Sequence, residues 1–565
     1  MAAAASLLSA ATLASAQTPP PVAREFLAVW VATVRNIDWP SKPGLSTWDQ
    51  QRELLAILDS AAALKLNAVI LQIRPGADAF YNSPYEPWSE FLTGRQGRAP
   101  EPPWDPLAFA VEQAHKRGLE LHAWFNPYRA AYVTDTANAR THVTITHPEL
   151  VRPYGHFVWM DPGDPAVRRR AVRAVVDVVR RYDVDGVHID DYFYPYPEND
   201  SAGKPIDFPD SATYARYVRG GGTLSKDDWR RHNVDELVEA LYKGVRATKP
   251  WVKVGISPFG MWRPGNPPQI TGFDAYAKIY ADSKKWLQNG WLDYLAPQLY
   301  WPISPPQQSF VALYDWWRTQ NTKHRHIWPG LGTYRIAAHN ATHIPSDEIV
   351  AEIDSMRVRG GDMGHIHFNA STLMKSPDSL DAKLAILYAQ PALVPASPWL
   401  GAARPGRPAV KLRRDPATND QTIVMSPGSG PKVWLWTVRS RIDTGWTTEI
   451  LPGWLRLHRL PERATQAYVT AVSRTGVESS AVHVTIDAHG ASGSPPSMDL
   501  SSNAPSASRS ATASMLAILP SPNRSSKTSS IRPLIGTSTP TSPSMSPATA
   551  AFARPLNIPA TSAAP

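Results

Sequence analysis

Residues Asp185–Pro195 read DGVHIDDYFYP, a short apolar stretch that ends in two acids and three aromatic residues. Successive side chains of a strand point to opposite faces, so Val187 and Ile189 share one face and His188 and Asp190 share the other. We expect the aliphatic face to meet helices and the polar face to point away from them. This stretch therefore predicts a buried strand with a carboxylate at its carboxyl end.

The same kind of segment recurs along residues 24–390, where apolar strand candidates alternate with amphipathic helix candidates. The strand candidates are Phe26–Val34, Ala68–Ile73, Leu119–Phe125, Gly186–Asp190, Val252–Ser257, Leu292–Leu299, His326–Thr333 and Gly364–Asn369. The helix candidates are Trp48–Leu66, Pro106–Arg117, Ala166–Tyr182, Lys226–Thr248, Tyr276–Asn289, Gln307–Thr319 and Ser346–Arg359. Such alternation implies parallel strands with right-handed crossovers, and we expect a closed (β/α)8 TIM barrel with long insertions.

An open, doubly wound sheet is the structural alternative. That fold would need a Gly-rich phosphate-binding turn after the first strand. The segment Val34–Trp39 reads VRNIDW and contains no glycine, so the sequence favours the barrel.

The two ends of the chain differ in composition from its middle. Residues 1–16 are almost entirely Ala, Leu, Ser and Thr and end in Ala-Ser-Ala, which predicts a cleaved secretory signal peptide. No Lys or Arg precedes the apolar stretch, which leaves an Ala-rich tail as the alternative reading. Residues 17–24 form a Pro-rich spacer, and we place the barrel at residues 25–392. Residues 488–565 are rich in Ser, Pro, Thr and Ala, and we expect this tail to be disordered.

Residues 394–487 carry short alternating strand candidates separated by turns, which predicts a small all-β sandwich. Within it, Ala467–Ser479 (AYVTAVSRTGVES) resembles the last hairpin of a fibronectin type III module. Four tryptophans of this region could form an accessory sugar platform, although packing in the core of the sandwich is the simpler interpretation: Trp434, Trp436, Trp446 and Trp454.

Composition excludes several classes of function. The chain of 565 residues has no cysteine, which rules out disulfide scaffolds, thiol nucleophiles and Cys-ligated metals. The net charge of +9 is spread without a basic block, so we expect no nucleic-acid partner, and no apolar run is long enough to span a membrane. We expect a monomer that needs no cofactor and no metal.

Applied to the other strands, the same alternation brings polar and aromatic side chains to the barrel mouth. We predict Asp190 and Asp191 as the catalytic acids. The predicted substrate-binding residues are Trp39, Arg74, Asp78, Trp124, Asn126, His188, Tyr192, Gln298, Tyr300, Trp301, Tyr334 and His367. Aromatic rings stack on the C–H faces of sugars while amides and carboxylates bind hydroxyls, so this set predicts a carbohydrate site.

Hydrolysis of a glycosidic bond normally needs two carboxyl groups, one of them protonated. Asp190 and Asp191 can perturb each other, but their opposite orientation in a strand argues against joint contact with one oxygen unless the chain bends. Other acids in loops after strands are Asp78, Asp161 and Glu198, whereas the fifth strand has none. The residues alone motivate one carboxylate and leave its partner open.

The stretch Glu25–Gln390 resembles the bacterial glycosyl-hydrolase-like 10 family. The matching blocks are Val29–Val34 with Asp38–Pro40, Pro87–Ser89, Ala114–Gly118, His122–Tyr128 (HAWFNPY), Asp161–Gly163, Asp185–Pro195, Ile256–Trp262 (ISPFGMW) and Leu292–Pro302 (LDYLAPQLYWP). The resemblance implies a (β/α)8 barrel and hydrolysis of glycans that contain N-acetylhexosamines. Peptide-free peptidoglycan strands are the expected substrate, and export to the periplasm or medium is expected.

The segment Asp185–Tyr192 is also similar in outline to the chitinase motif D-G-x-D-x-D-x-E, but His188 replaces the middle Asp and Tyr192 stands at the place of the acid. Two mechanisms stay open. In a substrate-assisted route the acetamido oxygen attacks the anomeric carbon, and in a two-carboxylate route Asp190 acts with a second acid.

Two other functions remain as alternatives. The pair His365 and His367, with further inward histidines, could belong to a metal-dependent hydrolase, although amidohydrolase barrels carry such a pair on the first strand. The unassigned second carboxylate would also fit a non-catalytic glycan-binding protein.

Overall fold

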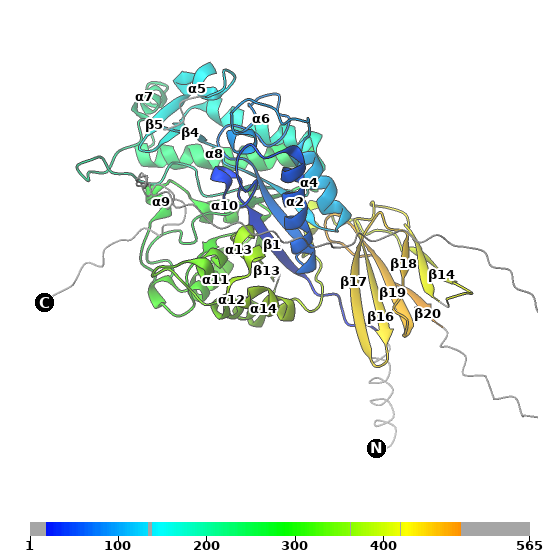
Figure 1. The fold of residues 1–565 in the computed structure, drawn as a ribbon. Helices are drawn as coiled ribbons and strands as arrows, with labels where there is room; N and C mark the ends of the chain where they lie inside the picture. The colour runs from blue at the N-terminus through cyan, green and yellow to red at the C-terminus, as the bar shows by residue number, and fades with distance from the viewer. Residues whose placement is uncertain (1–17, 134–137, 362, 419, 487–565) are drawn as a thin grey trace, which may run out of the picture. The chain divides into compact units, whose positions relative to one another are not determined.

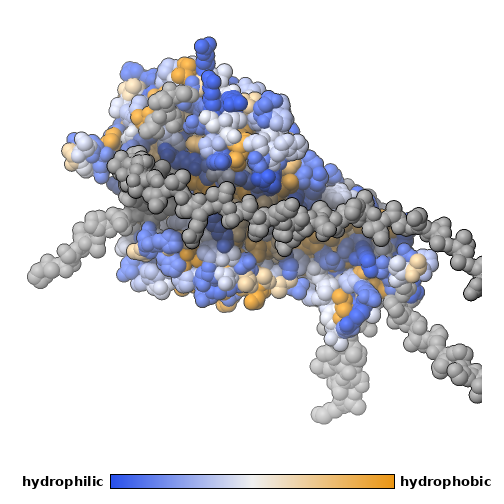
Figure 2. Space-filling model, viewed as in Figure 1, coloured by the Kyte–Doolittle hydropathy of each residue, from blue (hydrophilic) through white to orange (hydrophobic). Residues whose placement is uncertain are grey.

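The computed structural model describes residues 18–133, 138–361, 363–418 and 420–486. The predicted signal peptide and the predicted tail lie outside these ranges. No helix in the described ranges is both long and apolar enough to cross a membrane. On the face shown in Figure 2, hydrophilic residues cover most of the surface and hydrophobic residues form small patches among them.

The centre of the molecule is a sheet of ten parallel strand segments in the order β10-β12-β13-β1-β2-β3-β7-β8-β9-β11 (Figure 1). Their bounds are β1 (Glu25–Val31), β2 (Ala68–Arg74), β3 (Glu120–Phe125), β7 (Gly186–Ile189), β8 (Lys253–Ile256), β9 (Tyr294–Leu295), β10 (Gln298–Leu299), β11 (His326–Ile327), β12 (Gly330–Leu331) and β13 (Met363–His367).

Two barrel strands are each divided into two short segments, and these segments stand at the two edges of the sheet. Segments β9 and β10 are separated by two residues, and so are β11 and β12. Segment β9 pairs with β8 and β11, while β10 pairs with β12, which pairs with β13. Because β13 pairs with β1, the ladder returns to its start. The ten segments are therefore eight barrel strands, and the predicted closed (β/α)8 barrel is confirmed.

The helices that surround the strands begin close to the predicted positions (Figure 1). Three of these helices, which begin at Thr47, Pro106 and Pro165, are capped at their amino ends. The side-chain oxygens of Ser46, Asp105 and Asp164 accept hydrogen bonds from backbone N–H groups of the first turn. The main helices are α2 (Thr47–Ala63), α4 (Pro106–Lys116), α6 (Pro165–Arg181), α8 (Lys226–Thr248), α10 (Ser283–Asn289), α11 (Phe310–Gln320), α12 (Ser346–Arg359) and α14 (Leu380–Leu387).

One predicted helix is wrong in its length. The segment predicted at Tyr276–Asn289 consists of a short helix, α9 (Ala275–Lys278), and of α10. Tyr280 between them has a φ of 56°, a left-handed conformation that a helix cannot continue through. Asp282 then caps α10 by accepting the N–H of Lys285.

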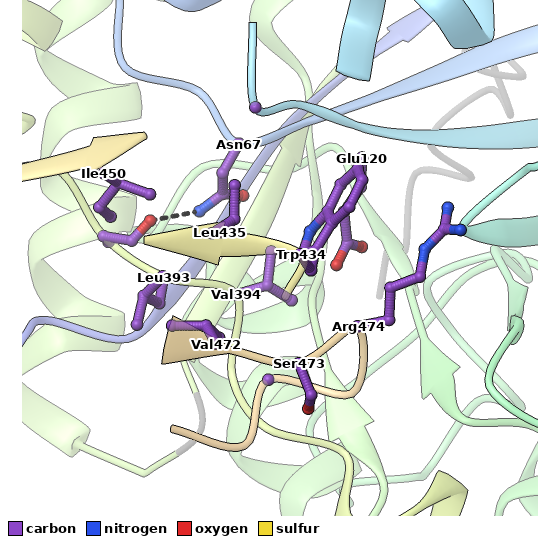
Figure 3. Close-up of a pocket in the computed structure, with 13 residues that line it drawn as sticks. Asn67, Glu120, Leu393, Val394, Trp434, Leu435, Ile450, Val472, Ser473 and Arg474 are labelled. Atoms are coloured by element: carbon purple, nitrogen blue, oxygen red, sulfur yellow. Dashed lines mark hydrogen bonds between the residues drawn. The ribbon is translucent and has the colours of Figure 1, made fainter. Parts of the chain in front are cut away.

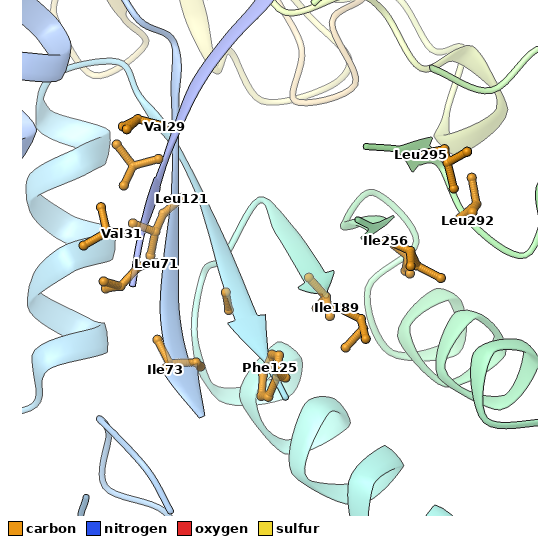
Figure 4. Packing of buried hydrophobic residues seen from close by; sticks show 14 of the residues in the cluster. Val29, Val31, Leu71, Ile73, Leu121, Phe125, Ile189, Ile256, Leu292 and Leu295 are labelled. Atoms are coloured by element: carbon orange, nitrogen blue, oxygen red, sulfur yellow. The ribbon is translucent and has the colours of Figure 1, made fainter. Parts of the chain in front are cut away.

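Alternating side chains of the strands pack into two separate hydrophobic cores. On β1, Leu27 and Val29 belong to the large core between sheet and helices. Phe26 and Trp30 belong to a smaller core inside the barrel. Figure 4 shows the first kind of packing, with aliphatic side chains of neighbouring strands gathered on one side of the sheet. The alternation predicted from the sequence is confirmed on β1, but it is wrong on β13, where Ile366 faces inward and His365 and His367 face the helices.

An insertion between β3 and α6 contains a small antiparallel sheet that the sequence pattern does not predict. It has the order β4-β6-β5, with bounds β4 (Arg129–Tyr132), β6 (Phe157–Met160) and β5 (Val151–Tyr154). Strands of four residues are too short to show a clear alternation. This sheet matters because β4 carries Arg129 and Tyr132 to the rim of the barrel.

Residues beyond the barrel form two antiparallel sheets, as predicted. One has the order β14-β15-β18 and the other β17-β16-β19-β20, and they share a core that includes Ile423, Trp436 and Val469. The bounds are β14 (Ala409–Arg414), β15 (Gln421–Ser426), β16 (Leu435–Ile442), β17 (Gly445–Pro452), β18 (Leu457–Arg459), β19 (Ala464–Val472) and β20 (Val482–Thr485). The resemblance to fibronectin type III stays a prediction.

Candidate active site

Asp190 and Asp191 lie at the carboxyl end of β7, and only 4% and 5% of their surfaces are exposed. Asn126, which follows β3, donates to Asp190 Oδ2 at 2.7 Å. The backbone N–H of Tyr192 donates to Asp190 Oδ1 at 3.2 Å. Asp190 is therefore a buried carboxyl held on both oxygens at the end of the barrel where such enzymes place their chemistry.

Asp191 lies on the same side as Asp190 because the chain bends directly after the strand. Strand β7 ends at Ile189, and a bend begins at Asp191. The hydroxyl of Tyr196 donates to Asp191 Oδ2, and the amide of Gln298 also hydrogen-bonds to this carboxyl. The opposite orientation expected from strand alternation is thus removed, and the two acids form a pair.

Both carboxyls hold protons more tightly than exposed acids do. Burial, followed by the charge of Asp191, raises the pKa of Asp190 to about 7, although Arg129 lowers it in part. Burial also raises the pKa of Asp191, against the hydrogen bonds from Tyr196 and Gln298. In the described part of the chain neither carboxyl forms an ion pair. One proton held by this pair near neutral pH could be donated to a leaving group.

A chain of amides fixes the orientation of Asn126. Gln72 Oε1 accepts the backbone N–H groups of Thr33 and Val34, each at 2.9 Å. Its Nε2 therefore faces Asn126 Oδ1, at 2.7 Å, and the amino group of Asn126 is left to face Asp190. Strands β1 and β2 thus position the carboxyl on β7 through side chains that carry no charge.

Aromatic side chains of several loops surround the acids. The guanidinium of Arg129 lies 4.8 Å from the ring centre of Tyr192. Tyr300 stacks on Phe368 at 5.9 Å and meets Tyr334 edge-on at 5.8 Å. Further half-buried or nearly buried rings are those of Trp301, Tyr196 and Trp124, and the indole N–H of Trp124 has no hydrogen-bond partner in the described part of the chain. This wall of rings suits the C–H faces of sugars.

Several predicted binding residues are not brought to this mouth. Trp39 is fully buried and donates to the Gln50 carbonyl on α2, because the loop after β1 turns it toward the helices. Arg74 is buried in an ion pair with Glu86 at 2.5 Å. Asp78 is buried, and burial raises its pKa to about 7. The predicted inward orientation of His367 is wrong, because the inward residue of β13 is Ile366. His367 is level with Val29 on the helix-facing side of the sheet, where it bonds to Thr333 and to Tyr388.

His188 points inward as the alternation predicts, yet it lies too deep to contact a sugar. The indole of Trp30 can only donate, so His188 Nε2 accepts that bond at 3.1 Å. His188 Nδ1 then donates to the Tyr294 hydroxyl at 3.0 Å, which in turn donates to His122 Nδ1 at 2.8 Å. Burial keeps the pKa of His188 well below its ordinary value, so it is a neutral link in the barrel interior.

Arg129 and Tyr196 contribute to the site although the sequence reasoning does not select them. Tyr196 lies five residues after Asp191 in the aromatic run Tyr192–Tyr196, and this run was the available signal. Arg129 follows the HAWFNPY block directly, but its strand β4 is too short to be recognised from its pattern.

The described residues offer no set of ligands for the alternative function, a metal-dependent hydrolase. Across the described ranges, no three His, Asp or Glu side chains converge as metal ligands would. His365 and His367 both bond to the hydroxyl of Tyr388, at 2.6 and 3.0 Å.

A small cavity of about 30 Å³ lies at the amino ends of the strands, whereas Asp190 follows the carboxyl end of β7 (Figure 3). Its lining includes Asn67 and Glu120, which lie at the starts of β2 and β3, and apolar residues such as Leu435 and Val472. A volume of this size holds about one water molecule. It is therefore no substrate site.

The sequence matches the family model described as Glycosyl hydrolase-like 10 over residues 25–345. The chain is 43% identical over 417 residues to glycosyl hydrolase YngK of Bacillus subtilis, covering 71% of this chain and 78% of YngK. It is 36% identical over 331 residues to glycosyl hydrolase DigH of Escherichia coli, covering 54% of this chain and 73% of DigH.

Among solved structures, the glycoside hydrolase domain of PgaB (BpsB) from Bordetella bronchiseptica aligns with a TM-score of 0.42 and 14% identity. The alignment covers 65% of this chain and 99% of that domain. The family model and the two homologous sequences carry the conclusion: the chain belongs to the glycosyl hydrolase-like 10 family and is a glycoside hydrolase.

Proposed function

We propose that the enzyme hydrolyses glycosidic bonds in a polysaccharide that contains N-acetylhexosamines, with peptide-free peptidoglycan strands as its substrate. One observation carries the proposal: Asp190 and Asp191 form a buried carboxyl pair without an ion-pair partner in the described chain, at the aromatic mouth of the barrel. Family membership supports a carbohydrate substrate.

Asp190 is the proposed general acid. Its pKa of about 7 keeps a proton available at neutral pH, and that proton passes to the glycosidic oxygen as the C–O bond breaks. Asp191 is the proposed partner, because Tyr196 and Gln298 hold its carboxyl in one orientation. In the substrate-assisted route it orients the acetamido group whose oxygen attacks the anomeric carbon.

A direct route through both carboxyls uses the same pair differently. Asp191 then attacks the anomeric carbon itself, or accepts a proton from the attacking water. The substrate-assisted route passes through an oxazolinium ion of the substrate. The direct route passes through a glycosyl ester of the enzyme if Asp191 attacks, and through no covalent intermediate if water attacks. A substrate whose acetamido group is replaced by hydroxyl separates the two routes, because only the direct route would cleave it.

Mass spectrometry of products tests the proposed substrate. Peptide-stripped peptidoglycan strands and chitin oligomers would be incubated with the enzyme and with the Asp190→Asn variant. We expect shortened strands with new reducing ends from the first substrate and none from the variant. Binding of strands without release of any new end, over long incubation, would contradict the proposal.

We further propose that the enzyme is exported, to the periplasm or the medium, and acts as a monomer. The Ala-Ser-Ala pattern at residues 14–16 supports export. The two C-terminal sheets, proposed to be a fibronectin type III-like module over residues 394–487, would serve as a spacer or interaction domain.

A further inference from the structure

We propose that Arg35 forms a subsite for a free carboxylate on the glycan and so favours strands whose sugar carboxylates are not joined to peptide. The inference rests on the proposed function, and it adds the group that would distinguish peptide-free from peptide-bearing strands. N-acetylmuramic acid carries such a carboxylate on its lactyl ether, and attachment of a peptide turns this charged group into a neutral amide.

Arg35 lies in a strained and tightly held turn directly after β1. Its backbone is left-handed, with φ 51° and ψ 24°, and the next residue, Asn36, has φ 55°. The side-chain amide of Asn36 donates to the carbonyls of Pro40 and Phe91, both at 2.8 Å, and so joins the loops after β1 and β2. Two consecutive left-handed residues other than glycine are costly, and such strain is concentrated at functional sites.

The guanidinium of Arg35 is exposed and positioned by an aromatic ring. It lies 4.0 Å from the ring centre of the buried Tyr132 on β4. No acid of the described chain forms an ion pair with it. Stacking fixes the plane of the guanidinium and leaves its N–H groups at the edge available, which is the geometry that binds a carboxylate through two hydrogen bonds.

A hollow of about 340 Å³ lies beside this guanidinium. Its lining comes from the loops that follow β1, β2 and β3 and consists of Arg35, Asn36, Pro43, Glu90, Phe91, Gly94 and Tyr132. Pockets for small ligands have volumes of about 300–1,000 Å³. The hollow is therefore large enough for a substituent of a sugar ring.

Side-chain contacts connect the hollow to the catalytic pair. Arg129 Nη1 lies 3.5 Å from the Tyr132 hydroxyl, and the same guanidinium lies over the ring of Tyr192. Arg129 also lowers the pKa of Asp190, which places its charge near that carboxyl. A strand bound at Asp190 can thus reach Arg35 with a neighbouring sugar.

Glu90 also lines the hollow, and its substitution provides a second test of the proposed carboxylate subsite. Its negative charge opposes binding of a carboxylate, whereas Arg35 favours it. Removal of the two charges should consequently change the preference between charged and neutral strands in opposite directions.

The experiment compares three substrates: peptide-stripped strands, the same strands with carboxylates converted to methylamides, and chitin oligomers. We expect the wild-type enzyme to prefer the first over the second. Arg35→Gln should lower kcat/KM on the free-carboxylate strands about 10-fold, mainly through KM, and leave the other two unchanged. Arg35→Lys should restore part of the loss, and Glu90→Gln should strengthen the preference for free carboxylates.

Arg180→Gln, which removes an exposed arginine on α6, is the matched control and should behave as wild type. Equal losses of Arg35→Gln on all three substrates, or a wild-type enzyme that does not distinguish methylamidated strands, would overturn the subsite. If the wild type cleaves none of the substrates, the proposed function fails. Affinity of the strands for wild type and Arg35→Gln then decides the subsite separately.

Discussion

Each end of the barrel contains a buried carboxyl group, but the pKa is lowered at one end and raised at the other. At the amino end, Glu120 at the start of β3 contacts Lys253 Nζ at 2.8 Å and His122 Nε2 at 3.0 Å. Burial alone would raise the pKa of Glu120, but Lys253 and His122 hold it below its ordinary value. At the carboxyl end, burial and Asp191 raise the pKa of Asp190 to about 7.

The difference lies in the partners, since burial is almost the same at both ends. A buried carboxylate with a cation beside it stays ionised and ties two strands together. A buried carboxyl with neutral donors and a second acid beside it titrates near neutral pH and can transfer a proton. The comparison therefore separates structural from functional acids within one barrel, and the following substitutions test it.

The largest expected effect is on catalysis. Asp190→Asn should lower hydrolysis about 1,000-fold, because it removes the proposed acid. Ionisation of Asp190 costs stability as pH rises between about 4 and 7, since its folded pKa lies above the unfolded value of about 3.9. The neutral Asn should therefore leave the Tm at pH 7 unchanged or higher, as differential scanning fluorimetry would show.

The matched control is Glu120→Gln at the other end. It leaves Lys253 buried without its charge partner and should cost about 3 kcal/mol of unfolding free energy. Residual enzyme that remains folded should keep its kcat. Loss of activity without loss of stability in Glu120→Gln would contradict the assignment of Glu120 as a structural acid.

The second prediction concerns pH. Wild-type kcat/KM should fall as pH rises through about 7, because the acid must be protonated to act. In Asp191→Asn the charge that raises the pKa of Asp190 is gone, so the falling limb should move to lower pH. We also expect kcat to drop about 100-fold. A limb that stays in place would mean that the two carboxyls are not coupled.

The third prediction concerns the interior between the two ends. His188→Ala removes the partner of Trp30 and Tyr294 and should lower stability by about 3 kcal/mol, measured by chemical denaturation. Its KM should stay close to that of wild type, because His188 lies below the mouth. A large rise in KM with unchanged stability would restore His188 as a binding residue.

The smallest effect is expected outside the barrel. Trp454 is 60% exposed, whereas Trp436 is fully buried in the core of the C-terminal sheets. Trp454→Ala should leave both Tm and hydrolysis of short oligomers unchanged, and Trp436→Ala should cost about 3–5 kcal/mol. A loss of affinity for long strands in Trp454→Ala alone would indicate the accessory sugar platform.

The barrel could be predicted because its strands are buried on both faces and therefore appear as apolar runs between amphipathic helices. The insertion sheet β4-β6-β5 could not, since its strands have four residues each. In the site, Asp190 and Asn126 follow from their positions at strand ends. Tyr196 does not, because it lies in a loop without a repeating pattern, and Arg129 does not, because its strand β4 is too short to be recognised.

The sequence alone indicates which side chains of β1, β2, β3 and β7 face the barrel interior, because strand geometry alternates with a period of two. It misplaces His365 and His367 of β13, which share the helix-facing side with Leu27 and Val29 while Ile366 faces inward. It did not determine how deep each one lies, which depends on the register between neighbouring strands. His188 is level with Trp124 and Gly255, so it ends inside the barrel while Asp190 reaches the mouth. The bend after β7, which turns Asp191 toward Asp190, was likewise decided by tertiary contacts with Tyr196 and Gln298.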